Sequence, residues 1–283
     1  MHSIVVLVYN SPAYSVRCLE SILANIDADD ELIAVDNGSG EETVRLLDEL
    51  RDRPATAGRL TVIRNETNVG CSTGRNQGVD AARGEDIAFL DNDTIVTDPS
   101  WLGTLRDAID RWPGAGMAGP KLVYPGEPRR IQFAGGGVSP TGRIAFLGRG
   151  RAADDPAFNE RREVQFFITA CLMVRHDVLD DVGGFDEAFN PVQFEDIDLC
   201  YRARERGYKA IYVPEVEITH CESVTTAASG KLNNAYIVTK HGMLFKKRWR
   251  HMFEGEGGPS DEQIGRWEGI AGSVGFPGGE RST

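Results

Sequence analysis

The chain has 283 residues, of which 41% are hydrophobic and 26% charged, so it is long enough to bury a sizeable core without disulfides or metals. Asp and Glu total 43 against 31 for Lys and Arg, and the net charge of −12 excludes a protein-wide surface for nucleic acid or other polyanions. No apolar run approaches the roughly 20 residues of a membrane span, and we expect no signal peptide.

The first 90 residues alternate between apolar strands and amphipathic helices. Continuous apolar runs predict strands over 4–8, 32–35, 60–63 and 87–90. Helices are predicted between them, the first beginning near Pro12, the second through 44–50 and the third over 73–82. This order predicts a parallel sheet covered by helices, a class in which ligands bind beyond the carboxyl ends of the strands.

The second half of the chain is less regular. Residues 124–162 are rich in Gly, Pro and Arg and predict short strands and long loops. After them we expect, in order, a buried strand over 164–174, a helix over 194–207 ended by Gly207, a short strand over 211–213 and a helix over 233–253. Beyond Glu254 the chain is polar and Gly-rich, which predicts a loose tail.

Polar side chains follow three of the predicted strands. Tyr9 and Asn10 come after the first strand, Asp36 after the second and Asp91 after the fourth. Because parallel strands end at one edge of the sheet, we expect these side chains to converge there. That convergence is the first indication of a functional site.

The sequence Asp91-Asn92-Asp93 places two carboxylates one residue apart at a strand end. Mg²⁺ and Mn²⁺ prefer oxygen ligands and commonly link carboxylates to a diphosphate. Asp and Asn also favour turns, but the position on the same edge as Asp36 favours a metal site. His220 follows a β-like run and would complete the coordination, although a lone His is more often structural.

Three acids, Glu195, Asp196 and Asp198, open a predicted helix. The helix dipole and capping explain one or two acids in a first turn but do not require three. A carboxylate at this position can serve as a general base.

Residues 71–78 predict a turn that feeds a helix. The backbone N–H groups at the helix start and the Arg75 guanidinium can receive phosphate oxygens. Gly and Ser are common at helix starts, so this segment alone is weak evidence for phosphate binding.

Together these motifs resemble those of family 2 glycosyltransferases with the GT-A fold. The matching pieces lie between about residue 3 and about residue 220 and come in the family's order, which makes the set specific. They are Tyr9-Asn10 and the segments 35–39, 68–70, 74–78, 89–93, 169–175, 183–187 and 194–199. The resemblance implies an α/β fold of the GT-A type: an α/β/α sandwich with a Rossmann-like nucleotide-binding half and a mixed central sheet.

The resemblance also implies a metal-dependent enzyme. It would move a sugar from a nucleotide diphosphate sugar to an acceptor hydroxyl with inversion at the anomeric carbon, without a nucleophilic Cys or Ser. Asp196 would deprotonate the acceptor, and Asp93 would ligate Mg²⁺ or Mn²⁺. Asp91 would reach the ribose or the metal's water shell, and His220 the metal or the diphosphate.

The remaining residues carried over from the family form two groups. The group implied for the nucleotide is Tyr9, Asn10, Asp36, Asn68, Gly70, Arg75, Asp91 and Asn92. Within it, Tyr9 and Asp36 would hold the base and ribose, and Arg75 would contact the base or the diphosphate. The group implied for the wall around the acceptor and the donor sugar is Gly184, Phe185, Asp186 and Glu195.

The expected domain organisation follows the same resemblance. Residues 1–120 form the nucleotide-sugar-binding half, 121–230 the acceptor-binding and catalytic half, 231–254 a C-terminal basic helix and 255–283 a flexible tail. A UDP- or dTDP-linked donor is expected, and the family's rhamnosyltransferase branch shares this layout. The acceptor would be a glycan or a lipid-linked hydroxyl in polysaccharide or cell-envelope synthesis.

Two other functions stay open. A sugar nucleotidyltransferase would carry a Gly-rich basic signature at the first strand-to-helix turn, which residues 9–12 lack. A non-catalytic nucleotide-sugar-binding module would tend to lose the acids that this chain keeps. Five scattered cysteines without a CxxC pair predict reduced thiols in a cytoplasmic protein. The basic stretch 246–250 admits a peripheral membrane contact, although a solvated helix face is the favoured explanation.

Overall fold

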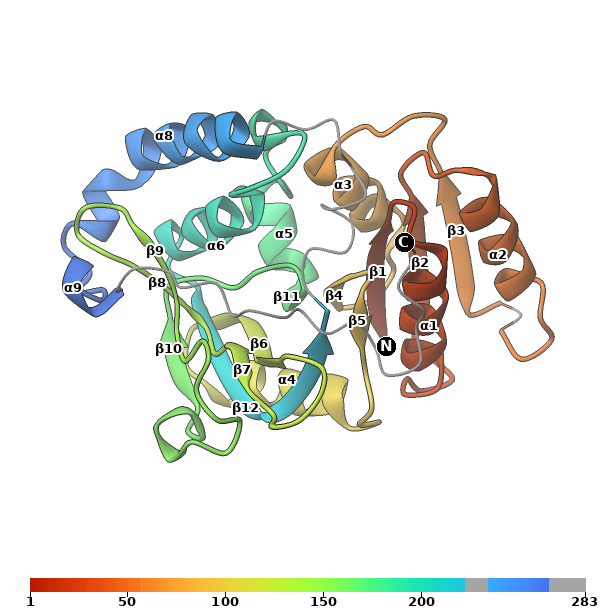
Figure 1. The fold of residues 1–283 in the computed structure, drawn as a ribbon, viewed down its shortest axis with the longest axis horizontal. Helices are drawn as coiled ribbons and strands as arrows, with labels where there is room; N and C mark the ends of the chain where they lie inside the picture. Colours follow the sequence, from red (N-terminus) through yellow and green to blue (C-terminus); the bar gives the residue numbers. More distant parts are fainter. Residues whose placement is uncertain (57, 222–233, 265–283) are drawn as a thin grey trace.

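The computed structural model of the chain describes residues 1–56, 58–221 and 234–264. Within them a mixed ten-stranded sheet has the order β10-β12-β6-β11-β4-β1-β2-β3, with β5 paired to β12 and β7 to β6 (Figure 1). A separate two-stranded sheet is formed by β8 and β9. The strands are β1 His2–Val8, β2 Glu31–Asp36, β3 Leu60–Arg64, β4 Asp86–Asp91, β5 Thr94–Ile95, β6 Ala115–Val123, β7 Ile131–Phe133, β8 Gly136–Val138, β9 Ile144–Phe146, β10 Arg162–Val164, β11 Cys171–Arg175 and β12 Lys209–His220.

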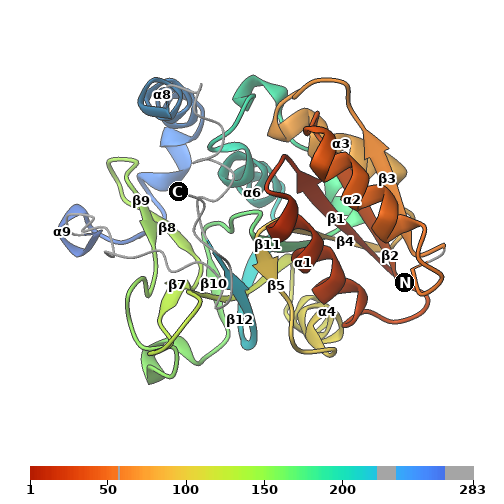
Figure 2. The same ribbon diagram turned by 45° about the vertical axis from the view of Figure 1, so that its right-hand side comes forward.

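Helices cover both faces of the sheet, as an α/β/α sandwich requires. α1 packs on α2, and the carbonyl of Asn25, just after α1, accepts a hydrogen bond from Trp101 of α4. α3 and α6 lie on the other face (Figure 2), where α5 packs beside α6 (Figure 1). The helices are α1 Pro12–Leu23, α2 Glu41–Arg51, α3 Cys71–Ala81, α4 Trp101–Arg111, α5 His176–Val182, α6 Glu195–Glu205, α8 Asn234–Phe253 and α9 Asp261–Ile264, with 3₁₀ helices at η1 Pro156–Phe158 and η2 Glu187–Phe189.

The N-terminal half forms as the sequence predicts. β1 pairs in parallel with β2 and β4, and β2 with β3, so these four strands end at one edge of the sheet. β2 is buried along its whole length, which is the environment that continuous apolar runs favour. Pro12 occupies the first helical position of α1, and Gly207 follows α6 with a φ of 94°, as expected for the residue after a helix C-cap.

The second half makes the sheet mixed. β11 runs antiparallel to both β4 and β6, and β12 runs parallel to β6. The expected boundary between residues 120 and 121 falls inside β6, so one strand belongs to both predicted halves. The sheet is therefore continuous across that boundary.

The strand predicted over 164–174 is wrong. The structure has two strands there, β10 on β12 and β11 on β4 and β6, separated by residues 165–170. Phe166 and Phe167 make this connection apolar because both rings are buried, against Gly136 and Gly119 respectively. Burial in a loop therefore produced a strand-like pattern. The structure also contains α4, β6 and α5, for which the sequence pattern gives no prediction.

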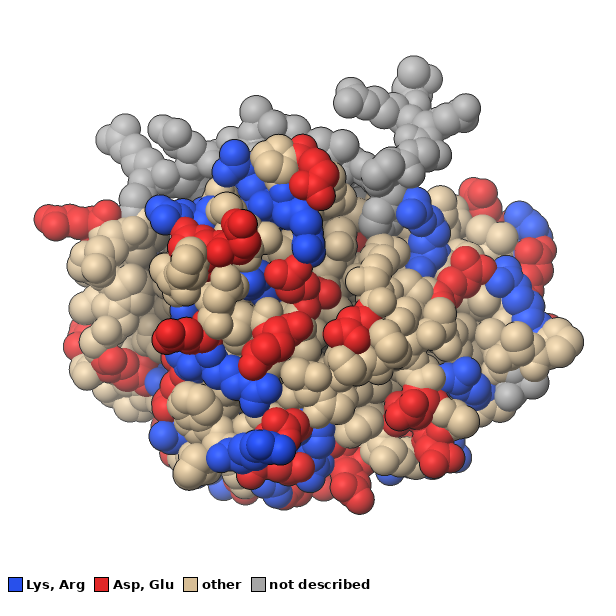
Figure 3. All heavy atoms as spheres, turned by 90° about the horizontal axis from the view of Figure 1, so that it is seen from below, with Lys and Arg blue, Asp and Glu red and all other residues tan. Residues whose placement is uncertain are grey.

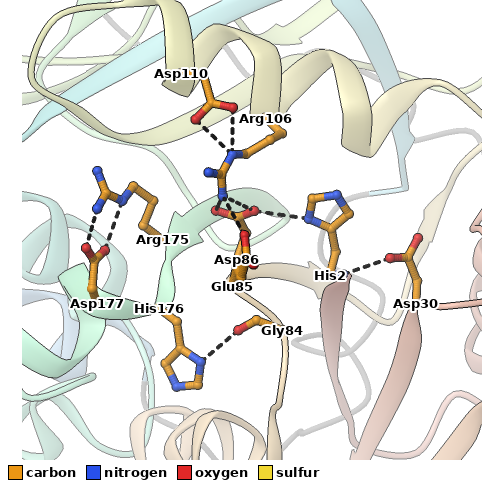
Figure 4. Close-up of polar contacts among 10 residues, drawn as sticks. All are labelled: His2, Asp30, Gly84, Glu85, Asp86, Arg106, Asp110, Arg175, His176 and Asp177. Atoms are coloured by element: carbon orange, nitrogen blue, oxygen red, sulfur yellow. Dashed lines mark hydrogen bonds and ion pairs between the residues drawn. The ribbon is translucent and has the colours of Figure 1, made fainter.

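A polar network connects β1, β4 and α4 at the edge of the sheet where β1 and β4 begin (Figure 4). The Asp86 carboxylate is buried and accepts from Arg106 Nη1 at 2.6 Å and 2.7 Å. His2 Nδ1 lies 3.1 Å from the same carboxylate, and the His2 backbone N–H donates to Asp30. Because Asp86 is enclosed and bonded to a cation, this network fixes α4 on the sheet.

The C-terminal helix predicted over 233–253 is present as α8, except that residue 233 lies outside the described residues. The loose tail predicted from residue 255 is wrong for its first ten residues. Glu256 accepts hydrogen bonds from Gln165 and Arg204, and Asp261 accepts one from Thr141. These contacts hold residues 255–264 against the β8–β9 hairpin and α6, and residues 265–283 lie outside the described part. None of the described helices is long and apolar enough to cross a membrane.

Candidate active site

A cavity of about 450 Å³ opens where β1, β2 and β4 end, beside the start of α6. That volume lies in the range of small-ligand sites. The sequence-predicted residues that line it are Tyr9, Asn68, Arg75, Asp91, Asn92, Asp93, Glu195, Asp196 and His220. Residues on α3, β4, α6 and β12 and in the loops after β1, β3 and β4 thus meet at one site.

Asp91, Asp93 and His220 form a cluster in this cavity. Their ligand atoms lie within 4.8 Å of one another. His220 Nε2 is 3.1 Å from Asp93 Oδ1 and 4.0 Å from Asp91 Oδ2. β5 pairs with the end of β12, which brings the His220 backbone opposite Thr94 and next to the two acids. Two carboxylates and an imidazole are a donor set that fits a divalent cation such as Mn²⁺.

Gln132, on β7, fixes the His220 ring. His220 Nδ1 is 2.6 Å from Gln132 Oε1, and Gln132 Nε2 donates to the His220 carbonyl at 3.2 Å. With its proton on Nδ1, the ring donates a hydrogen bond to Gln132 Oε1, and the lone pair of Nε2 faces the two acids. Gln132 is 1% exposed. No sequence pattern points to Gln132, because its partner lies 88 residues away.

Arg75 crosses the floor of the cavity. Its guanidinium donates to Glu195 Oε1 at 2.8 Å and to Asp91 Oδ1 at 3.0 Å, and its carbon lies 5.7 Å from the centre of the Phe185 ring. Arg75 thereby links the acid cluster at the end of β4 with the start of α6. The second oxygen of Glu195, Oε2, is buried and has no hydrogen-bond partner among the described residues.

Asp196 faces the cavity beside this ion pair. Burial, together with the neighbouring Glu195 charge, raises the pKa of Asp196 to about 7, although Arg75 opposes the shift. Such a carboxyl is partly ionised at neutral pH and can exchange a proton there. By contrast, burial raises the pKa of the Cys71 thiol to about 12, which makes it a poor nucleophile.

The start of α6 owes its direction to strained backbone. Gln193 has a φ of 83° and Phe194 a φ of 72°, a conformation that residues with side chains rarely adopt. This turn directs Glu195 and Asp196 toward the cavity. Strain held at one helix start is typical of functional sites.

The helix start proposed for phosphate binding is occupied by the protein itself. The backbone N–H of Cys71 donates to the Pro191 carbonyl, and that of Ser72 donates to Asn190 Oδ1. Gly70 makes this contact feasible, since a Cβ there would lie 2.3 Å from Asn190 Oδ1. The prediction that these amides receive phosphate is therefore wrong.

Asn10 and Asp36 do not line the cavity. Asp36 is fully buried and accepts from the Ser39 N–H and from Arg64. Asn10 Oδ1 accepts from the Gly40 N–H. Both residues shape the loop after β2, next to Tyr9.

Gly184, Phe185 and Asp186 also lie outside the cavity lining, unlike Glu195. The Phe185 backbone exchanges hydrogen bonds with the Asn76 side chain, and its ring packs under Arg75. Burial disfavours the charged Asp186, but hydrogen bonds from Ala188 and Arg248 outweigh it and lower the pKa of Asp186. These residues support the cavity from behind rather than forming its surface.

Several lining residues were not singled out from the sequence. Asn37 is buried and holds the 68–70 loop through Asn68 Oδ1 and the Val69 N–H. One side of the cavity is apolar and includes Ile144, Phe146 and Val238. Within the irregular segment 124–162, β9 thus contributes to this side of the cavity. The sequence does not distinguish these apolar residues from those of the hydrophobic core, because both are of the same residue types.

Comparison with known families decides what kind of protein carries this cavity. The model of glycosyl transferase family 2 matches residues 3–183. The chain belongs to glycosyl transferase family 2. Among its relatives, an N-acetylglucosaminyl-diphospho-decaprenol L-rhamnosyltransferase of Mycobacterium tuberculosis is 26% identical over 281 residues, with 87% of each protein covered. The protein y4gI of Sinorhizobium fredii is 32% identical over 226 residues, which are 78% of this chain.

The chain spans only a small part of the length of some relatives it matches. The matched region is 24% of y4gI and 15% of the O-antigen biosynthesis protein RfbC of Myxococcus xanthus. Solved structures confirm the GT-A fold. GalNAc-T7 with UDP, GalNAc and Mn²⁺ matches with a TM-score of 0.64 at 18% identity, over 78% of this chain and 43% of that one. The mannosyltransferase PcManGT from Pyrobaculum calidifontis, with GDP-Man and Mn²⁺, matches with 0.56 at 16% identity, over 89% and 70%.

Proposed function

We propose that this glycosyltransferase moves a sugar from a UDP- or dTDP-linked donor to an acceptor hydroxyl in one inverting displacement. The observation that carries the proposal is that a single cavity holds both the Asp91–Asp93–His220 cluster and Asp196. The cluster suits a metal-bound diphosphate, and Asp196 suits a general base. Family membership supplies glycosyl transfer as the reaction class.

Asp196 is the proposed base. The acceptor hydroxyl gives its proton to Asp196 while its oxygen forms a bond to the anomeric carbon, and the bond from that carbon to the diphosphate oxygen breaks. The pKa of about 7 suits this task, because the carboxylate is available near neutral pH and still basic enough to take a proton. No covalent enzyme intermediate is needed.

Asp91, Asp93 and His220 are the proposed metal ligands. A bound Mg²⁺ or Mn²⁺ would supply positive charge that offsets the charge developing on the leaving diphosphate. Two structural neighbours contain Mn²⁺ with a nucleotide or nucleotide sugar, which supports this role for the cluster.

Tyr9 and Asn68 are the proposed contacts of the nucleoside, with Asn92 lining the space between them and the acid cluster. All three face the cavity near the ends of β1, β3 and β4. Asn10, Asp36 and Gly70 would act indirectly, by holding the loops that carry these contacts. The buried, unpartnered Oε2 of Glu195 supports a hydrogen bond from a donor-sugar hydroxyl.

The acceptor is proposed to be a glycan or lipid-linked hydroxyl in polysaccharide or cell-envelope synthesis. The relatives named as an L-rhamnosyltransferase acting on a diphospho-decaprenol and as a glucosyl-dolichyl phosphate glucuronosyltransferase support a lipid-linked acceptor. The apolar side of the cavity suits an acceptor with apolar surface.

Thermal unfolding with UDP, dTDP and GDP, each with and without Mn²⁺, tests the proposal. Ligand binding to the folded state raises the melting temperature by mass action. We expect a metal-dependent rise with UDP or dTDP, and the nucleotide that gives it selects the donors for transfer assays. No rise with any nucleotide at millimolar concentration would overturn the proposal, and a rise without transfer from any donor would favour a non-catalytic binding module.

A further inference from the structure

The outward side of α8 combines cations with exposed apolar side chains. Tyr236, Lys240, Met243, Lys247 and Arg250 are all exposed. At 3.6 residues per turn they fall within an arc of about 80°. We call these five residues the outward stripe. Opposite it, the buried stripe of α8 is Ile237, His241, Phe245, Trp249 and Phe253.

The buried stripe of α8 packs against the protein, so the outward stripe is on the opposite side of the helix. Phe245 packs on Tyr201 and Phe194, with ring centres 5.1 Å and 5.6 Å away, and Trp249 donates to Asp198. Arg248 also turns inward, to Asp186 and Asp198. The helix therefore lies over α6 (Figure 1). The outward stripe is on the side of α8 that points away from α6.

The charge of α8 is opposite to that of the whole chain. Its 20 residues include five Lys and Arg and no Asp or Glu, whereas the chain has a net charge of −12. On the face seen in Figure 3, acidic and basic side chains are interspersed. Arg250 has one acidic neighbour, Glu254 at 3.6 Å, in an exposed pair that is worth little.

Exposed apolar side chains gather on the same helix. Among the described residues, the large hydrophobic side chains that are exposed are Met1, Tyr236, Val238 and Met243. Three of these four lie on α8, with exposed fractions of 65% for Tyr236 and 63% for Met243. Cations alone would suit any anionic solute, but cations interleaved with apolar groups suit the interface of a lipid bilayer.

We propose that the outward stripe of α8 binds the surface of an anionic lipid bilayer and holds the cavity mouth beside it. Val238, on the same helix, lines the cavity, so the stripe and the mouth are about one helix diameter apart. Tyr236 and Met243 enter the headgroup region, and Lys240, Lys247 and Arg250 contact anionic headgroups. With three exposed cations, each contributing about a fivefold factor, binding is reversible and salt-sensitive.

Vesicle flotation tests this surface without nucleotide or metal, so the result is independent of the proposed reaction. The whole protein is mixed with vesicles of phosphatidylcholine, or of phosphatidylcholine and phosphatidylglycerol in equal parts. We expect binding only to the anionic vesicles, and its loss at high salt. Absence of binding to anionic vesicles at low salt, or equal binding to both kinds, would overturn the proposal.

Two variants and a matched control locate the surface. Neutralising the stripe as Lys240→Gln, Lys247→Gln and Arg250→Gln is expected to weaken partitioning by roughly a hundredfold. The control neutralises three exposed cations elsewhere, Arg45→Gln, Arg53→Gln and Arg111→Gln, and is expected to bind as the parent does. Equal loss in both triple variants would show a net-charge effect and sink the proposal.

The apolar contribution has its own variant. Met243→Ser removes an exposed side chain and leaves the charge unchanged, so the fold is expected to keep its melting temperature. We expect about tenfold weaker partitioning with an unchanged salt dependence. Binding unaffected by Met243→Ser would contradict insertion of the stripe into the headgroup region.

Discussion

Arg75 and Glu195 form a buried ion pair of 2.8 Å between α3 and α6, although 120 residues separate them in the chain. The Arg75 side chain is 6% exposed and that of Glu195 is 5% exposed. The pair joins α3, which packs on β1 and β2, to the helix that carries Asp196. It therefore couples the stability of the fold to the position of the proposed base.

Removing Arg75 is expected to destabilise the protein. Arg75→Leu leaves the Glu195 carboxylate buried without its cation, a change that costs about 3–5 kcal/mol. Urea unfolding measures it, with Arg45→Leu as an exposed control that should change stability by less than about 1 kcal/mol. The double variant Arg75→Leu with Glu195→Gln should recover part of the loss, and no recovery would contradict a direct coupling.

Asp196→Asn separates transfer from donor binding. The amide cannot take the acceptor proton, so we expect transfer to fall by about 10²–10⁴-fold. Nucleotide affinity with Mn²⁺, measured by calorimetry, should stay within about twofold, because the role proposed for Asp196 is toward the acceptor and not the nucleotide. A loss of affinity as large as the loss of rate would remove Asp196 from the role of base. Asp181→Asn, in an exposed ion pair on α5, is the control.

The pH dependence of transfer is expected to follow the ionisation of the Asp196 carboxyl. Asp196 must be ionised to act, so kcat/KM is expected to rise with pH and level off above about 7. Glu195→Gln removes the neighbouring charge that raises this pKa, so its acid limb should move to lower pH. An acid limb that stays in place in Glu195→Gln would mean that another group controls the profile.

Gln132→Ala tests the orientation of His220. Without the contact at 2.6 Å to Nδ1, the imidazole loses its fixed tautomer and direction. We expect Mn²⁺ affinity, measured by titration with UDP present, to fall about 10–100-fold. Gln77→Ala, whose side chain bonds to Asn65 instead, should bind Mn²⁺ as the parent does. Unchanged affinity in Gln132→Ala would exclude His220 as a ligand or Gln132 as its support.

The Asp86 network predicts acid sensitivity. Burial would raise the pKa of Asp86, but hydrogen bonds from His2 and Arg106 outweigh it and lower the pKa. A carboxyl with a lowered pKa stabilises the fold above its unfolded value of about 4, and that contribution disappears as pH falls through the folded value. The free energy of unfolding of the parent should therefore drop below about pH 4. Asp86→Asn should be less stable at pH 7 and show a shallower drop; equal slopes would contradict the assignment.

Local pattern determined much of the N-terminal half. The apolar runs of β1, β2, β3 and β4 were readable because strands buried on both faces need continuous apolar residues. The ends of β1 and β4 carry Tyr9 and Asp91 into the cavity for the same reason: parallel strands end at one edge. Motif order along the chain was enough to indicate the family.

Tertiary structure decided the rest, because those features depend on contacts between distant residues. Phe166 and Phe167 give the sequence a strand-like apolar pattern, but in the structure they are buried residues of the connection between β10 and β11. Packing of residues 190–191 onto the start of α3 occupies amides that sequence alone assigned to phosphate. The ion pair of Arg75 with Glu195 and the support of His220 by Gln132 join segments whose separation no local pattern encodes. Composition and periodicity indicate which residues are buried. The contacts of each buried polar group depend on the tertiary structure, because its partners are distant in the chain.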